Sequence, residues 1–187
     1  MSKRGINEKL DRLRDLIQDE DFLKGRGLSN EVNIRIMCYH PKDEMAVRHF
    51  IGQIKADKGI KCNVREYNLY HLFLKICEEK RILDKIPGME EKRGKSFLLG
   101  QLQRIASAKE FVARMDYDDH QEGDVIIIDG IGEVFPFMRV HTLLENMQPY
   151  FGDVPVVVMY PGNFDGNSLK LFNEFKPNSY YRAFNIV

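Results

Sequence analysis

The chain has 187 residues, 43% of them hydrophobic and 30% charged, a composition typical of a globular protein that buries its own core. Its 28 Lys and Arg residues balance 28 Asp and Glu residues, so the whole chain has no net attraction to nucleic acid or anionic lipid. Three cysteines without a C-x-x-C spacing, no apolar signal core and no apolar run of membrane-spanning length predict a cytoplasmic protein with reduced thiols.

Helices and strands alternate in the first half of the chain. In chain order, this half is predicted to contain a helix over about 7–19 capped by Asn7, a strand at 32–39, a helix from Pro41 to Gly59, a strand at 60–67 and a helix capped by Asn68. Proline is tolerated at the first helical position because its missing N–H would have no partner there. Pro41 therefore marks a helix start directly after the first strand.

The alternation continues in the second half. In chain order, this half is predicted to contain two helices that meet near residue 106, strands at 124–129 and 154–160, a helix capped by Asn167 or Ser168, and a last strand at 181–187. Ser107 and Glu110 have the spacing of a capping box, which places the break between the two helices.

The strands at 124–129 and 154–160 are nearly continuous apolar runs, typical of strands covered on both faces. Strands that alternate with helices predict parallel pairing with right-handed crossovers. The sequence therefore predicts a single three-layer α/β domain over 1–187, with a mostly parallel sheet of about five strands flanked by helices. We expect it to be Rossmann-like or P-loop-like without a phosphate-binding loop, with the N-terminal helix packed on it.

Two segments resemble parts of a P-loop enzyme, and each lacks a requirement. "RGKS" at 93–96 has the end of the phosphate-binding motif, but five residues instead of four separate Gly88 from Gly94, and no strand precedes it. "VIIID" places Asp129 at a strand end, where such enzymes hold magnesium, but the first strand ends in "YHPKDE" without glycine. The glycines after Asp129 are interpreted as a turn that lets the chain leave the sheet.

Polar and aromatic side chains gather where the third and fourth strands are predicted to end. Parallel strands end at one edge, and open α/β folds bind their ligands there. A turn with Pro161-Gly162 and Asp165-Gly166 follows the fourth strand. The predicted partner-binding residues at this edge are Glu133, Phe135, Phe137, Arg139, Tyr160, Asn163, Phe164, Asp165, Tyr181 and Arg182, with His141 near them. No catalytic residue, metal site or cofactor is predicted, since no G-x-S-x-G, H-E-x-x-H or G-x-G-x-x-G is present.

Charge is distributed unevenly along the chain. Residues 116–153 contain nine acidic side chains and one basic side chain, Arg139, whereas residues 75–115 contain ten basic and six acidic side chains. This asymmetry can orient a protein partner. It also leaves DNA binding as an alternative, through Lys80, Arg81, Lys85, Lys92, Arg93, Lys95 and Arg104.

Four long segments resemble the BrxB family, a small component of bacteriophage exclusion (BREX) defence systems. They are "DFLKGRGLSNEVNI", "GIGEVFPFMRVHTLLENMQP", "VPVVVMYPGNFDGNSLKLF" and "NSYYRAFNIV", which occur in the same order between residues 21 and 187. Phe135 stands where tyrosine is expected in many members, so a role for a phenol there is not carried over. The family has no established catalytic residues.

The resemblance implies a bacterial cytoplasmic protein that works beside other BREX components. These include a PglZ-type phosphatase-like protein, the first expected partner, and then a large ATPase and a DNA methyltransferase. The leading hypothesis is a non-catalytic adaptor that docks another defence protein through the loop edge of the sheet. The alternative is a divergent nucleotide- or metal-dependent enzyme that uses Asp129, Glu133 and Asp165.

Overall fold

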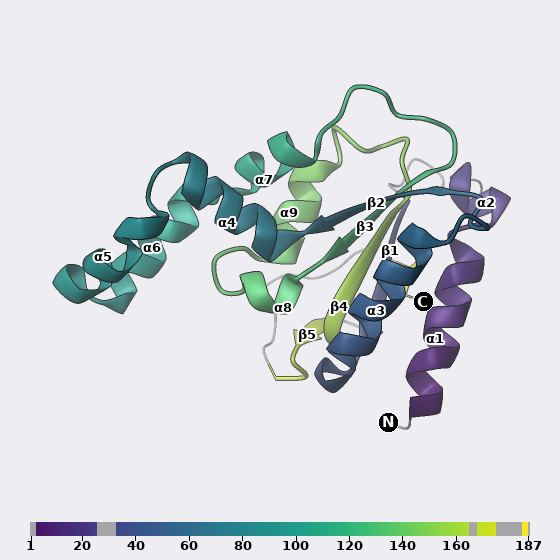
Figure 1. Cartoon of the computed structure of the whole chain (residues 1–187), viewed down its shortest axis with the longest axis horizontal. Helices are drawn as coiled ribbons and strands as arrows, with labels where there is room; N and C mark the ends of the chain where they lie inside the picture. Colours follow the sequence, from purple (N-terminus) through teal and green to yellow (C-terminus); the bar gives the residue numbers. More distant parts are fainter. Residues whose placement is uncertain (1–2, 26–32, 165–167, 175–184, 187) are drawn as a thin grey trace.

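A central parallel sheet with helices on both faces organises the chain (Figure 1). The computed structural model describes residues 3–25, 33–164, 168–174 and 185–186. The elements are, in order, α1 (Lys3–Leu16), α2 (Glu20–Leu23), β1 (Ile34–Tyr39), η1 (Pro41–Asp43), α3 (Glu44–Ala56), β2 (Asn63–Asn68), α4 (Leu69–Glu79), η2 (Leu83–Lys85), α5 (Ile86–Arg93), α6 (Lys95–Ile105), α7 (Ala108–Met115), β3 (Asp124–Asp129), α8 (Ile131–Val134), α9 (Val140–Met147), β4 (Val156–Phe164), β5 (Leu169–Leu171) and β6 (Asn185–Ile186).

The strand order is β2-β3-β4-β1-β6, and every neighbouring pair on this path is parallel. The short strand β5 pairs antiparallel with the end of β4. β1 therefore lies between two strands from the second half of the chain. This confirms the predicted three-layer α/β class with a mostly parallel sheet.

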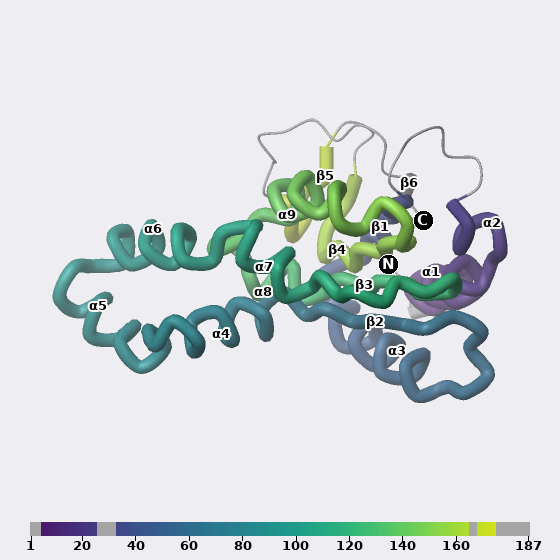
Figure 2. Tube along the Cα trace, turned by 90° about the horizontal axis from the view of Figure 1, so that it is seen from above, coloured from purple at the N-terminus to yellow at the C-terminus, as the bar shows by residue number. Residues whose placement is uncertain are grey.

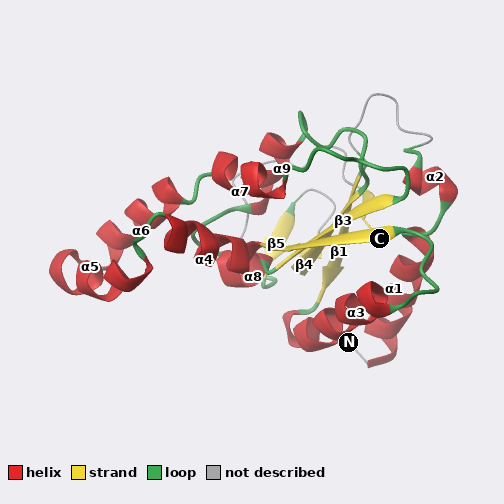
Figure 3. Ribbon diagram, turned by 45° about the horizontal axis from the view of Figure 1, so that its top comes forward, coloured by secondary structure: helices red, strands yellow, loops and turns green. Residues whose placement is uncertain are grey.

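Two groups of helices cover the two faces of the sheet. α1, α2 and α3 pack on one face, where alternate strand residues such as Met37, Ile127 and Val157 point toward them. α4 and α6 to α9 pack on the other face, against the intervening residues such as Ile36 and Ile128. All six residues of β3 are buried, as its continuous apolar sequence predicts for a strand covered on both sides. Figure 3 shows the helices on either side of the strands.

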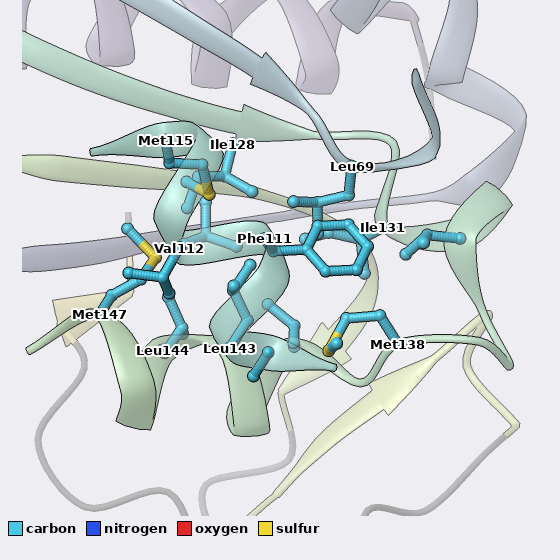
Figure 4. Packing of buried hydrophobic residues seen from close by; sticks show 14 of the residues in the cluster. Leu69, Phe111, Val112, Met115, Ile128, Ile131, Met138, Leu143, Leu144 and Met147 are labelled. Atoms are coloured by element: carbon cyan, nitrogen blue, oxygen red, sulfur yellow. The ribbon is translucent and has the colours of Figure 1, made fainter. Parts of the chain in front are cut away.

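Phe111 on α7 is at the centre of the larger core. It is fully buried, and Figure 4 shows its ring among side chains from several elements, including Leu69, Ile131, Met138 and Leu143. These residues come from α4, α8, the following turn and α9. The core thus fixes the helices after β3 against the helix after β2, which positions the loops at the end of the sheet.

α5 and α6 extend beyond the sheet as a helical hairpin, most visible when the molecule is seen from above (Figure 2). No residue of α5 is buried. The segment "RGKS" lies within this hairpin, where Gly94 joins α5 to α6. A helix and not a strand precedes it, so the requirement for a phosphate-binding loop is absent there.

Several predicted boundaries differ from the structure. The helix expected over 7–19 spans Lys3–Leu16, so Asn7 lies inside it, and Asp19 instead caps the separate helix α2. The break expected near residue 106 is present, although the Ser107 side chain makes no capping hydrogen bond.

The segment after the fourth strand was expected to begin with a turn and then a helix. Instead, β4 continues through Phe164, and Leu169–Leu171 forms β5. Pro161 and Gly162 are strand residues because β5 and the residue after it supply partners beyond the parallel sheet: Gly162 pairs with Leu171, and the Phe172 N–H donates to the Pro161 carbonyl at 2.8 Å. The last predicted strand, 181–187, is seen as β6 over Asn185–Ile186; residues 181–184 and 187 lie outside the described residues.

Candidate functional site

The carboxyl ends of β1, β2, β3 and β4 meet at one edge of the sheet. β1 is followed by α3 on one face, and β3 is followed by α8 and α9 on the other face. Open α/β sheets hold ligands where consecutive connections leave to opposite faces. This carboxyl edge is therefore the first place to look for a functional site.

Asp129, the last residue of β3, is buried at this edge with 3% exposure. Its Oδ2 accepts a hydrogen bond from Asn68 Nδ2 at 3.1 Å, while its Oδ1 is buried without a hydrogen-bond partner among the described residues. Burial raises the pKa of Asp129 to about 6, and nearby Glu66 and Glu44 add to the increase. The surroundings of Asp129 therefore stabilise its ionised form only weakly.

Asn68 and Gly130 are the neighbours of Asp129 at this edge. Asn68 ends β2 opposite Asp129 in the sheet register, and its side-chain oxygen caps α4 by accepting the His71 N–H at 3.0 Å. Gly130 has φ +70°, and a Cβ there would lie 2.7 Å from the Asn68 side-chain oxygen. The glycine is therefore required both for the backbone conformation and for the approach of Asn68. This agrees with the interpretation of a turn that directs the chain out of the sheet.

Arg48 lies at this edge and contacts two glutamates. From α3 it donates to Glu44 Oε1 at 2.9 Å and reaches Glu133 Oε2 of α8 at 2.5 Å. These bonds raise the pKa of Arg48, the bond to Glu133 most strongly. Arg48 thus ties the helix after β1 to the helix after β3.

Tyr39 adds a further hydrogen bond to this network. The residue is 2% exposed, and its hydroxyl donates to Glu44 Oε2 at 2.6 Å. Burial is the main reason that the pKa of Tyr39 is raised, so the phenol stays protonated. Glu44 consequently accepts hydrogen bonds from both Tyr39 and Arg48 and is held in one orientation.

The turn after β1 does not form a phosphate cradle. His40 Nδ1 accepts the Lys42 N–H at 3.1 Å, and Pro41 has no N–H to offer. A P-loop instead wraps phosphates with several free backbone N–H groups ahead of a helix. The first turn also contains Asp43 and Glu44, whose charges would repel phosphate.

The metal-binding potential of the edge is low on the residues that the structure describes. Among them, no three His, Cys, Asp or Glu side chains are grouped so that they could hold an ion. Asp129 has one unpaired oxygen, and Glu133 is bound to Arg48. Asp165, the third acid of the enzymatic hypothesis, lies outside the described residues.

The sequence-predicted partner-binding residues occupy different environments. Arg139 and Asn163 are exposed, whereas Phe135, Phe137 and Phe164 are half-buried against the larger core. The Phe137 ring stacks on Phe73 with centroids 4.4 Å apart. These aromatic rings therefore combine a packing role with partial exposure at the edge.

Other predicted members of the surface divide into buried and undescribed residues. Tyr160 is 4% exposed within β4, so it supports the edge from the core. Glu133 contacts Arg48, and His141 is half-buried on α9, where burial lowers its pKa. Tyr181 and Arg182 lie outside the described residues.

Sequence reasoning missed Tyr39, Glu44, Arg48 and Asn68 as members of the edge. The first three lie on β1 and α3, which are far from β3 along the chain. The only signal for Glu44 and Arg48 was the charged helix start "KDEMAVR", which follows an apolar strand that ends in Tyr39. Joining them to Asp129 and Glu133 requires knowing that β4 pairs with both β1 and β3.

The cationic residues considered for DNA binding are separated by the structure. Lys80 pairs with Glu110 at 2.7 Å beside the paired Arg114, at the base of the helical hairpin. The remaining members, Arg81, Lys85, Lys92, Arg93, Lys95 and Arg104, are exposed on the hairpin itself.

The fold and this edge define a class of protein: a three-layer α/β domain whose carboxyl edge is bridged by side-chain ion pairs and lacks a phosphate cradle. A family model described as "BREX protein BrxB" matches residues 65–186. A "BREX protein BrxB" of Bacillus cereus (strain H3081.97) is 39% identical over 98% of both chains. Another, of Escherichia coli O9:H4 (strain HS), is 26% identical over 97% of this chain and 92% of the relative.

The chain belongs to the BrxB family of BREX proteins. This confirms the resemblance inferred from the four sequence segments and makes the chain a member of a family of phage-exclusion components. No solved structure matches the chain significantly. Within the described part of the chain, no helix is both long and apolar enough to cross a membrane.

Proposed function

We propose that this protein is a non-catalytic adaptor of a BREX system, acting in the cytoplasm, that docks another BREX component through the carboxyl edge of its sheet. The observation that carries this proposal is the ion-pair bridge that Arg48 makes across this edge. Its guanidinium contacts Glu44 and Glu133 at the edge of the sheet where open α/β enzymes bind their ligands. An edge whose helices are linked by their own side chains is suited to presenting a fixed surface.

The loops around this edge have the composition of a protein interface. Half-buried Phe135, Phe137 and Phe164 provide apolar contact area, and exposed Arg139 and Asn163 provide polar groups beside it. Aromatic anchors with a polar rim are typical of protein–protein contacts. The PglZ-type phosphatase-like protein is the first candidate partner, followed by the large ATPase and the DNA methyltransferase.

Co-purification of the tagged chain with its co-expressed BREX neighbours tests the docking. We expect recovery of the PglZ-type protein by the unchanged chain, and at least a tenfold loss in the double variant Arg139→Glu with Asn163→Lys. Both residues are exposed, so the variant should keep its fold. Arg12→Glu with Gln53→Lys makes the same charge changes at exposed positions on α1 and α3 and should retain the partner.

A second experiment separates apolar anchoring from charge. Phe135→Ala with Phe164→Ala removes two half-buried rings and should also release the partner, with circular dichroism used to verify that the variant is folded. Recovery of no BREX component by the unchanged chain would contradict the docking proposal. Unchanged recovery of the partner by both edge variants would show that the interface lies elsewhere.

The enzymatic alternative is supported by a single feature, the unpaired buried Oδ1 of Asp129. A carboxyl group with a pKa of about 6 can exchange a proton near neutral pH. Calorimetry with magnesium and ATP or GTP tests this alternative. Binding heat that disappears in Asp129→Asn would favour an enzyme, whereas the adaptor proposal predicts no binding heat.

A further inference from the structure

The helical hairpin carries an unpaired positive charge that the proposed docking edge does not use. We call residues 81–105, which include η2, α5 and α6, the arm. The arm has six basic and three acidic side chains. None of its basic residues forms an ion pair with a described residue, whereas Lys80 and Arg114 at its base are paired with Glu110. The cations on the arm are therefore available to an external partner.

A groove of about 720 Å³ runs along the arm. Apolar side chains from both sides of the hairpin line it, including Ile82, Met89, Phe97 and Ile105. Its charged lining residues are three basic ones, Lys85, Lys92 and Arg93, and one acidic one, Asp84. The Arg93 guanidinium lies over the Phe97 ring at 4.7 Å. Leu83 beside the groove is 37% exposed, a high value for leucine. An apolar floor with a basic rim favours an apolar or aromatic insert that carries negative charge over a bare phosphate backbone.

A second surface of the same chain has the complementary features, an aromatic side chain and negative charge. We call Asp116, Asp118, Asp119, Glu122 and Tyr150 the acidic patch. Its four acids are exposed on the loop between α7 and β3, and no Lys or Arg occurs from residue 115 to 138. The side chain of Glu122 approaches one cation, Lys24, at 3.6 Å.

Tyr150 joins this patch through the contacts of its neighbour. The Phe151 ring packs against His120 and Tyr117, with centroids 5.8 and 6.4 Å apart, and His120 Nδ1 is 2.9 Å from Asp153 Oδ1. These contacts hold the loop after α9 against the acidic loop. Tyr150 itself is 50% exposed. The patch therefore combines an exposed aromatic side chain with a neighbouring acidic loop.

The arm and the acidic patch cannot contact each other within one molecule. Figure 1 shows the arm extending from one end, whereas the loop between α7 and β3 arches over the other. Two molecules placed antiparallel can bring each arm to the other's patch, and a two-fold pair repeats the contact twice. We infer that this chain forms a reciprocal homodimer in which Tyr150 and its acidic loop dock in the basic groove of a second copy.

Sedimentation velocity tests the pairing. At low salt we expect twice the 21.9 kDa mass of one chain, with dissociation as salt is raised because the charges are exposed and screened. Lys92→Glu with Arg93→Glu changes the net charge of the arm from +3 to −1, and Asp116→Lys with Asp118→Lys and Asp119→Lys changes that of the acidic patch from −4 to +2. Each should weaken dimerisation roughly 100-fold. Tyr150→Ser should also release the pair, and Met45→Ser, at another exposed apolar residue (74% exposed), should not.

Mixing the two charge-reversed variants gives the decisive measurement. In a mixed pair, the reversed arm faces the reversed patch, and the two unchanged surfaces face each other. Two variants that are monomeric alone should therefore form a heterodimer when mixed. A monomeric wild-type chain at high micromolar concentration, or a mixture that stays monomeric, would overturn the inference. So would an arm reversal that leaves the dimer intact and removes only DNA binding in a gel-shift experiment.

Discussion

At the scale of single residues, the ionised form of Asp129 is stabilised by one side-chain hydrogen bond and destabilised by burial. Its pKa in the folded protein, about 6, lies above its ordinary value of 3.8. The folded state therefore binds the proton more tightly than the unfolded state. Between about pH 4 and pH 6 the free energy of unfolding should fall as pH rises, and the loss is complete above pH 6.

Replacing Asp129 with asparagine removes the ionisation and keeps an oxygen that can accept the Asn68 hydrogen bond. We expect Asp129→Asn to raise the free energy of unfolding at pH 7 by about 3 kcal/mol, and to change it little at pH 4. Urea unfolding at the two pH values measures this, with exposed Asp119→Asn as the control. A variant less stable than wild type at pH 7 would show that the charge of Asp129 is required.

Gly130 tests whether the turn after β3 depends on space as well as on backbone conformation. Alanine at Gly130 would have to adopt φ +70° and place its Cβ against the Asn68 side chain. Alanine at Gly25, with φ +59°, meets no atom within 4 Å. Both variants should be destabilised by about 1 kcal/mol for the left-handed backbone, and Gly130→Ala by roughly 1–2 kcal/mol more. Equal losses in denaturant unfolding would mean that Asn68 moves aside freely.

At the scale of elements, the sequence predicted what is local and missed what depends on distant pairing. The apolar runs in β3 and β4 and the proline after β1 were sufficient for these strands and for the start of the following helix. Pro161 and Gly162 were interpreted as a turn, since that dipeptide favours one, but they lie in β4. The reason is β5, whose backbone approaches Gly162 so closely that a Cβ would lie 2.1 Å from the Lys170 carbonyl oxygen.

The candidate site shows the same limit. Asp129 and Glu133 were placed at the carboxyl edge from the strand that precedes them. Arg48 could not be added, because its place depends on the insertion of β4 between β1 and β3, which no local pattern encodes.

The close approach at Gly162 predicts a large effect of a single methyl group. Gly162→Ala should separate β4 from β5 and lower the free energy of unfolding by about 3 kcal/mol. Gly52→Ala, in the exposed middle of α3 with no atom within 4 Å of the added Cβ, should raise it by about 0.5–1 kcal/mol. Thermal unfolding of both variants against wild type checks the opposite signs. If Gly162→Ala leaves the free energy of unfolding unchanged, β5 does not unfold cooperatively with the rest of the sheet.

At the scale of the whole molecule, burial divides the protein into a tightly packed sheet and a thin arm. Every residue of β3 is buried, and none of α5 is. Local opening requires less free energy where fewer apolar contacts break. At a concentration that keeps the chain monomeric, we expect backbone amides of α5 to exchange with deuterium at least about 100-fold faster than those of β3. Hydrogen exchange with mass spectrometry measures the difference, and equal protection would contradict it.

The position of β1 has a consequence for synthesis on the ribosome. Its two neighbours, β4 and β6, are translated more than a hundred residues later. A nascent chain that has already emerged through β3 therefore exposes both hydrogen-bonding edges of an apolar strand, which are open to pairing with other chains. Completion of the sheet waits for the C-terminal strands, so translational pausing before residue 156 should favour aggregation or capture by chaperones.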